Sequence, residues 1–110
     1  MNTLRNKVQL IGNLGNDPEI INLESGKTLA KFAIATNESY TNTKGEKITD
    51  TQWHNVVAWG KTAQIIEKYV TKGKEVAIEG KLTSRSYDDK DGTKRYITEV
   101  VCSELLMLGK

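Results

Sequence analysis

The feature that most constrains the fold is a change of hydrophobic period in the middle of the chain. Elsewhere, apolar and polar residues alternate as in half-buried β-strands, for example in residues 28–38. In residues 61–73 they recur instead at helical spacing, at Ala63, Ile66, Tyr69 and Val70. Thr62 is placed to cap the start of this helix, and Gly73 to end it. The chain is therefore predicted to be a β protein with one inserted helix.

Strand-like segments lie on both sides of the helix. They cover residues 6–14, 28–38 and 51–60 before it, and 74–87 and 93–108 after it. Between them, "NDPE", "ESGK" and "DDKDG" are typical turns, and residues 40–50 are expected to form a long hairpin loop. Three strands, one helix and two strands is the order of an OB-fold, an all-β, five-stranded, partly open Greek-key barrel with its helix between strands 3 and 4.

Length and composition are those of a small globular protein. The 110 residues suffice for one domain, predicted to span residues 1–110, and the net charge is only +2. No apolar stretch approaches the ~20 residues of a membrane helix, and the N-terminus has no apolar signal core, so a cytoplasmic protein with no membrane association is expected. The single cysteine, Cys102, lies in an apolar run and is interpreted as a buried, unreactive thiol.

Two of the seven aromatic residues lie in one strand-like run, "WHNVVAWGK", residues 53–61. Because side chains alternate along a strand, Trp53 and Trp59 point to one face and Val56 and Ala58 to the other. The small side chains of Val56 and Ala58 suit the interior of a barrel. The two indoles either cover the open end of the core or a subunit interface, or form a surface on which nucleic-acid bases stack.

Two tyrosines and several cations favour the stacking interpretation. Tyr40 and Tyr87 stand among polar residues, where there is little core to join. Arg85 precedes Tyr87 by two residues and shares its face, and Lys61 follows Trp59 by two. Further candidate cations are Lys7, Lys72 and Lys81, and the remaining aromatics, Phe32, Tyr69 and Tyr96, are assigned to packing. Aromatic rings for bases and cations for phosphates are the two parts of a sequence-tolerant single-strand groove.

Five segments, in order from about residue 6 to residue 108, resemble the bacterial single-stranded DNA-binding proteins, the replicative SSB family. They are "NKVQLIGNLGNDPE", "FAIATNESY", "WHNVVAWGK", "YVTKGKEVAIEGKLTSRSY" and "YITEVV". The resemblance implies an OB-fold that binds single-stranded DNA without sequence preference. It also implies protection of that DNA in replication, recombination and repair, at the nucleoid, with no cofactor.

The resemblance further implies roles for individual residues. The base-stacking positions of the family correspond to Tyr40, Trp53, Trp59 and Tyr87. Its phosphate contacts correspond to Lys7, Lys61, Lys72 and Arg85. The family forms homotetramers, as dimers of dimers in which first strands pair between subunits, and the implied interface residues are Val8, Leu10 and His54.

The chain departs from the family pattern in two respects. Tyr40 and Tyr87 stand where the best-known members have tryptophan, and Trp59 stands where phenylalanine is usual. Stacking is expected to survive these changes. The sequence ends at "LLMLGK", as either a truncated or a naturally short homologue would, without the disordered, acid-tipped tail that recruits protein partners in the family, so the resemblance does not extend to tail-mediated recruitment.

The sequence is less compatible with other functions. "DDKDG" fails as a calcium loop because Tyr87 and Thr98 would occupy its first and last ligand positions, and His54 has no second ligand or nucleophile beside it, so neither an enzyme nor a metal site is expected. The sequence is also compatible with a primosomal-restart-type dimer, with another OB-fold binder of RNA or oligosaccharide, and with a structural module whose tryptophan face is buried in a partner.

Overall fold

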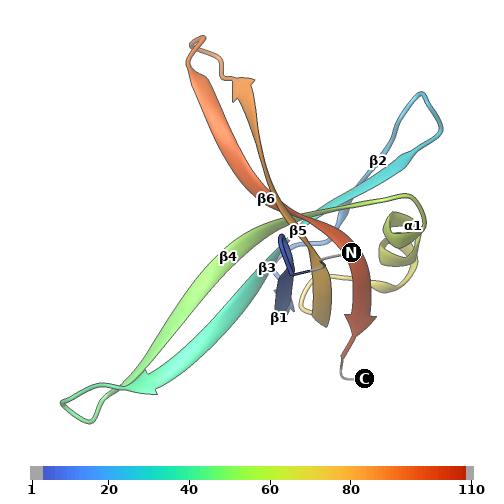
Figure 1. Ribbon diagram of the computed structural model, residues 1–110. Coiled ribbons are helices and arrows are strands. Elements are labelled where there is room, and N and C mark those ends of the chain that lie inside the picture. The colour runs from blue at the N-terminus through green and yellow to red at the C-terminus, as the bar shows by residue number, and fades with distance from the viewer. Residues whose placement is uncertain (1–3, 109–110) are drawn as a thin grey trace.

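The computed structural model describes residues 4–108, which form six strands and one helix (Figure 1). The elements are β1 (Val8–Leu14), β2 (Glu19–Asn22), β3 (Thr28–Thr41), β4 (Lys47–Trp59), α1 (Gly60–Tyr69), β5 (Glu75–Asp88) and β6 (Lys94–Met107). The helix lies between β4 and β5, which correspond to the third and fourth predicted strands. The short strand β2, between two turns, was not predicted.

The strands form one sheet that closes on itself. Their order is β1-β5-β6-β4-β3-β2, with β4 and β6 parallel and the other neighbours antiparallel. Asn13 and Leu14 of β1 also pair with Ala35 and Ile34 of β3, which closes a five-stranded barrel and leaves β2 outside it. This Greek-key order, with its single helix, confirms the predicted OB-fold.

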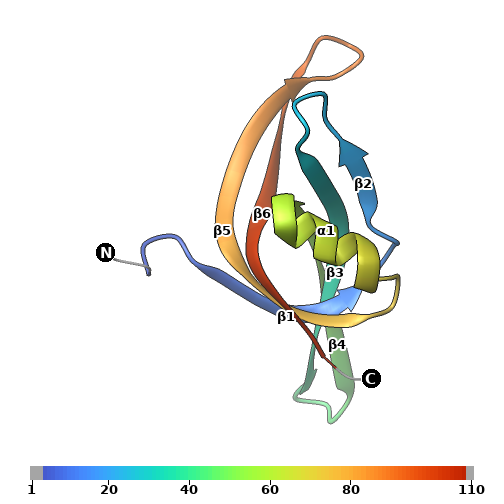
Figure 2. The same cartoon turned by 90° about the vertical axis from the view of Figure 1, so that its right-hand side faces the viewer.

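Alternate residues of the strands build the core. Along β3 the even positions Ala30, Phe32 and Ile34 are buried, and Val56 and Ala58 of β4 lie beside them. The helix lies across the barrel and adds Ala63 and Ile66 to the same cluster (Figure 2). The core is therefore formed by every second residue of the strands and is covered by the buried side of the helix, as the sequence indicates.

Two long hairpins, β3–β4 and β5–β6, extend beyond the barrel in different directions (Figure 1). The expected long loop over residues 40–50 is wrong, because β3 runs to Thr41 and β4 begins at Lys47. Polar side chains pair across these strands: Thr51 Oγ1 donates to Asn37 Oδ1 at 2.6 Å. The remaining turn is held by Asn42, whose Oδ1 accepts the N–H groups of residues 44 and 46, each at 2.9 Å. A polar strand outside a core lacks the hydrophobic alternation by which strands are recognised.

The helix begins earlier than predicted. Trp59 is its N-cap, and no side chain caps it, so the assignment of Thr62 as the cap is wrong. Gly60 has φ of +63°, a conformation that L side chains rarely adopt, and it turns the chain from β4 straight into the helix. The helix ends at Tyr69, and Gly73 lies in the turn that follows rather than at its end.

Two of the three aromatics assigned to packing are exposed. Phe32 is buried as expected, but Tyr69 and Tyr96 are 59% and 74% exposed. Tyr69 lies one position outside the buried stripe of the helix, which continues to Val70. Tyr96 pairs with Ser86 on the β5–β6 hairpin, where the strands have passed the core.

Candidate nucleic-acid interface

The two indoles lie on the outer face of the barrel. Trp53 and Trp59 are 62% and 45% exposed, whereas Val56 and Ala58 on the other face of β4 are buried. The predicted division of this strand is therefore confirmed.

Trp53 packs against a glycine of the loop that follows β1. A Cβ atom at Gly15 would lie 2.3 Å and 2.7 Å from Cζ3 and Cη2 of the indole, so no other residue fits beneath the ring in this position. The contact fixes one side of the indole and leaves the rest open to solvent. A fixed, exposed ring is suited to stacking because little rotamer freedom is lost when a ligand binds.

Strand pairing brings residues from β5 to the same outer face. Val57 of β4 pairs with Val101 of β6, and Thr83 and Arg85 of β5 pair with Glu99 and Ile97 of β6. Odd positions of these three strands therefore point outward together. Tyr87 follows on β5 and is about half exposed. We call this surface the aromatic face; it comprises Lys31, Trp53, Trp59, Arg85 and Tyr87.

Tyr40 does not join the other three aromatics. It lies on the β3–β4 hairpin, is 53% exposed, and pairs with Ile48. Both occupy even positions, so by strand parity they lie on the face opposite Trp53. The structure thus brings three of the four predicted stacking residues to one face and places the fourth on the other side of the hairpin.

Lys31 is a cation of the aromatic face that the sequence argument missed. It pairs with Val57 and lines two depressions that it shares with Arg85 and Glu99. These depressions run from Asn55, beside Val57, to Trp59. Strand parity placed Lys31 on the polar side of its own strand. Only the cross-strand register shows that this side belongs to the aromatic face.

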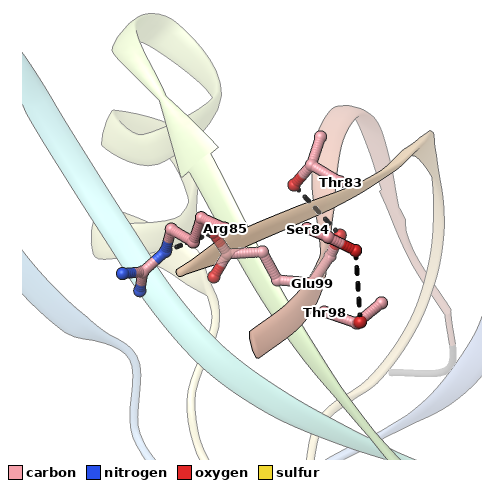
Figure 3. Close-up of polar contacts among 5 residues, drawn as sticks. All are labelled: Thr83, Ser84, Arg85, Thr98 and Glu99. Atoms are coloured by element: carbon pink, nitrogen blue, oxygen red, sulfur yellow. Dashed lines mark hydrogen bonds and ion pairs between the residues drawn. The ribbon is translucent and has the colours of Figure 1, made fainter. Parts of the chain in front are cut away.

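Arg85 forms an ion pair within the face. Its Nε lies 3.0 Å from Oε1 of Glu99, and Figure 3 shows the contact together with the neighbouring Thr83, Ser84 and Thr98. Glu99 is only 8% exposed although it occupies an outward position. Val57 is buried on the same face, where Trp59 and Arg85 line the depression around it.

The three predicted lysines differ in their surroundings. Lys61, in the first turn of α1, and Lys72, after the helix, are exposed, and neither forms an ion pair within residues 4–108. Lys7, in contrast, forms an ion pair with Glu79, in which Lys7 Nζ lies 3.2 Å from Glu79 Oε1. The pKa of Glu79 is lowered because Gln9 donates a hydrogen bond to it, and because Lys7 does the same. Lys61 and Lys72 are therefore freer to meet a phosphate than Lys7.

The predicted interface residues lie on another part of the surface. His54 is half-buried, with Nε2 3.0 Å from Oγ1 of Thr36, and it lines an open depression together with Leu10. Val8 and Leu10 are partly buried against the core. In the described chain, β1 residues 8–12 pair with β5 along one edge only, because β3 reaches β1 at residues 13 and 14. The other edge of β1 offers free backbone groups to a further strand.

Cys102 is buried, as predicted, and burial raises the pKa of its thiol to about 11. Such a thiol is a poor nucleophile at neutral pH.

"DDKDG" forms a turn in which Asp89 Oδ1 accepts the N–H of Thr93 at 2.9 Å, as its interpretation as a hairpin requires. Over residues 4–108, no group of three or more His, Cys, Asp and Glu residues is placed to hold a metal ion, and no helix has the length and apolarity to cross a membrane.

An OB barrel with exposed aromatic rings and cations on one outer face defines the class of OB-fold ligand-binding proteins. The sequence model of the "Single-strand binding protein family" matches residues 5–108. The chain belongs to this family, as its resemblance indicated. The family consists of binding proteins and not of enzymes, in agreement with the prediction.

Known relatives and a solved structure are similar along nearly the whole chain. Single-stranded DNA-binding protein 1 of Chlorobaculum tepidum is 50% identical over 94% of this chain, and the homologue of Bacteroides thetaiotaomicron is 45% identical over 94%. The chain spans 65% and 66% of the length of these two relatives. A Plasmodium falciparum SSB, solved in complex with ssDNA, superposes with a TM-score of 0.87 at 33% identity, covering 99% of this chain and all of that one.

Proposed function

We propose that the chain binds single-stranded DNA without sequence preference and protects it in replication, recombination and repair, with residues 1–110 acting as one domain. The observation that carries this proposal is the aromatic face itself. Its two exposed indoles and Tyr87 offer surfaces to bases, and its cations lie between and beside them. Membership of the single-strand binding protein family supports the same ligand. Because single-stranded DNA is exposed at the nucleoid, we propose a cytoplasmic, nucleoid-associated location.

Binding without sequence preference follows from the chemistry of this face. Every base has a π-face, and stacking on an aromatic side chain contributes about 1–3 kcal/mol per base. Lys61, Lys72, Lys31 and Arg85 provide charges for phosphates. Each phosphate contact with a single strand increases the salt slope, the magnitude of the fall of log K with log salt, by about 0.7. To reach Tyr40 as well, the strand must pass around the β3–β4 hairpin, because that ring lies on the opposite face.

Titration of a fluorescein-labelled oligo-dT, followed by anisotropy at several salt concentrations, tests the proposal. We expect tight binding that weakens linearly with log salt, and similar affinity for oligo-dC, whose bases differ in their hydrogen-bonding groups. Duplex DNA should bind far more weakly, since its bases are already stacked. Equal affinity for duplex and single strand, or preference for RNA of the same sequence, would contradict the proposal.

We further propose that the chain assembles as a homotetramer, a dimer of dimers. The free edge of β1 at residues 8–12 supports pairing with the first strand of a second subunit, and Ile11 and Leu106 are apolar and exposed. A primosomal-restart-type protein would instead be a dimer. Sedimentation velocity over a range of concentrations separates these states. His54→Ala is expected to shift the assembly toward smaller species; an unchanged tetramer at low concentration would contradict a role for His54.

A further inference from the structure

A buried carboxylate lies in the middle of the aromatic face. Glu99 is two residues before Val101, the partner of Val57, so it occupies the part of the barrel between Trp53 and Trp59. Its backbone is held from β5, since Thr83 Oγ1 donates to the Glu99 carbonyl at 3.3 Å (Figure 3). A negative charge here repels phosphate, so its presence on a surface proposed to bind DNA needs a separate reason.

The geometry of its contact with Arg85 suggests that reason. The guanidinium donates to Oε1 of Glu99 through Nε, at 3.0 Å, and this is its one hydrogen bond within residues 4–108. The two terminal nitrogens remain without partners there, and they lie on the side away from Glu99 (Figure 3). Together they carry four N–H groups in the planar arrangement that matches two oxygens of a phosphate.

We propose that Glu99 is a positioning residue for Arg85: by accepting the Nε–H, it directs the terminal nitrogens of Arg85 toward a DNA phosphate. This inference rests on the proposed binding of single-stranded DNA. A free arginine side chain loses considerable rotamer entropy when it is immobilised on a ligand, and a fixed carboxylate removes part of that cost before binding. Lys31, on the opposite side of the same depressions, completes the cationic environment of the phosphate.

The second carboxylate–cation pair at a predicted phosphate contact provides a contrast. Lys7 and Glu79 are each about one-third exposed, and the contact uses the ammonium group itself. An ammonium is a point charge without a planar fork, so a carboxylate beside it competes with phosphate and directs nothing. Of these two pairs, Arg85–Glu99 alone joins a buried acceptor to a donor that keeps its phosphate-binding end free.

Two substitutions separate positioning from charge. Glu99→Gln and Glu99→Ala both remove the negative charge, but only glutamine keeps an oxygen that can accept the Nε–H. We expect Glu99→Gln to bind oligo-dT at least as tightly as the unchanged protein. Glu99→Ala should bind at least about threefold more weakly than Glu99→Gln, with a salt slope lower by about 0.7. Both differences should vanish when Arg85→Ala is also present.

Equal affinities of Glu99→Gln and Glu99→Ala, or a difference that persists with Arg85→Ala, would overturn the inference. Should Glu99→Ala not fold, Arg85→Lys carries the same test at an exposed residue, because it keeps the charge and lacks the fork. Binding by Arg85→Lys as tight as by the unchanged protein would overturn the inference. Failure of the unchanged protein to bind oligo-dT would instead contradict the proposed function itself.

Discussion

The two faces of β4 differ in what holds them in place. On the inner face, Val56 and Ala58 are almost completely buried and fit a barrel of this size. On the outer face, Trp53 and Trp59 keep about half of their surfaces in water. Leaving large apolar rings exposed forgoes the stabilisation that their burial would bring. The inner face therefore serves the fold, whereas the exposure of the outer face is what the proposed binding of single-stranded DNA would account for.

The largest effect should come from the inner face. Ile34 is fully buried on β3, opposite His54 of β4. Ile34→Ala should lower the free energy of unfolding by about 2–5 kcal/mol, because it leaves a cavity in a closed core. Urea denaturation at fixed protein concentration measures this. The affinity of the folded fraction for oligo-dT should hardly change; a binding defect larger than the stability defect would break the division between faces.

The outer face should show the opposite pattern. Trp53→Ala and Trp59→Ala should each weaken oligo-dT binding by about 1–3 kcal/mol, with little change in urea midpoint, because the rings are exposed. Tyr69→Ala is the matched control: its ring is equally exposed but lies on the helix, outside the aromatic face. If Tyr69→Ala loses as much affinity as the two tryptophan variants, the loss depends on removing any exposed ring and not on the position of the ring in the aromatic face.

A smaller effect should follow from disturbing a tryptophan indirectly. In Gly15→Ala the added methyl would overlap the indole of Trp53, so the ring must move. We expect a loss of affinity below that of Trp53→Ala, and a changed near-ultraviolet circular dichroism spectrum of the free protein. The loss should disappear in the Trp53→Ala background. If it persists there, Gly15 acts through the chain and not through the ring.

The smallest effects should distinguish the cations. Lys61→Ala should lower the salt slope by about 0.7, because Lys61 has no carboxylate partner in residues 4–108. Lys7→Ala should change the slope less, since Glu79 already accompanies that charge. Slopes from anisotropy titrations between low and moderate salt give both values. A larger change in salt slope for Lys7→Ala than for Lys61→Ala would contradict the view that Lys61 is the freer of the two to contact a phosphate.

The fold could be predicted from the sequence wherever a strand has one face on the core. Alternation placed Phe32, Val56 and Ala58 correctly, and the single helical stripe placed α1. It failed for the β3–β4 hairpin, where polar strands pair without a core and residues 40–50 read as a loop, whereas both strands of the β5–β6 hairpin were predicted. The prediction also failed at the start of the helix, where the conformation of Gly60, rather than a capping side chain, sets the boundary.

The site was predictable one strand at a time but not across strands. Trp53, Trp59 and Tyr87 follow from their own surroundings, and all three are exposed. The inclusion of Lys31 and the burial of Glu99 depend on the register of β3 and β6 against β4 and β5, which no single segment encodes. The position of Tyr40 on the other face is a consequence of the same register.

Intrinsic tryptophan fluorescence during titration with a long oligo-dT tests the central claim most directly. The only tryptophans are Trp53 and Trp59, so emission reports on the outer face of β4 and nothing else. If bases stack there, emission should fall in step with the anisotropy of the labelled strand, and Trp53→Phe and Trp59→Phe should each retain part of the quenching. Binding without any change in emission would contradict the account, because the strand would then lie on another surface.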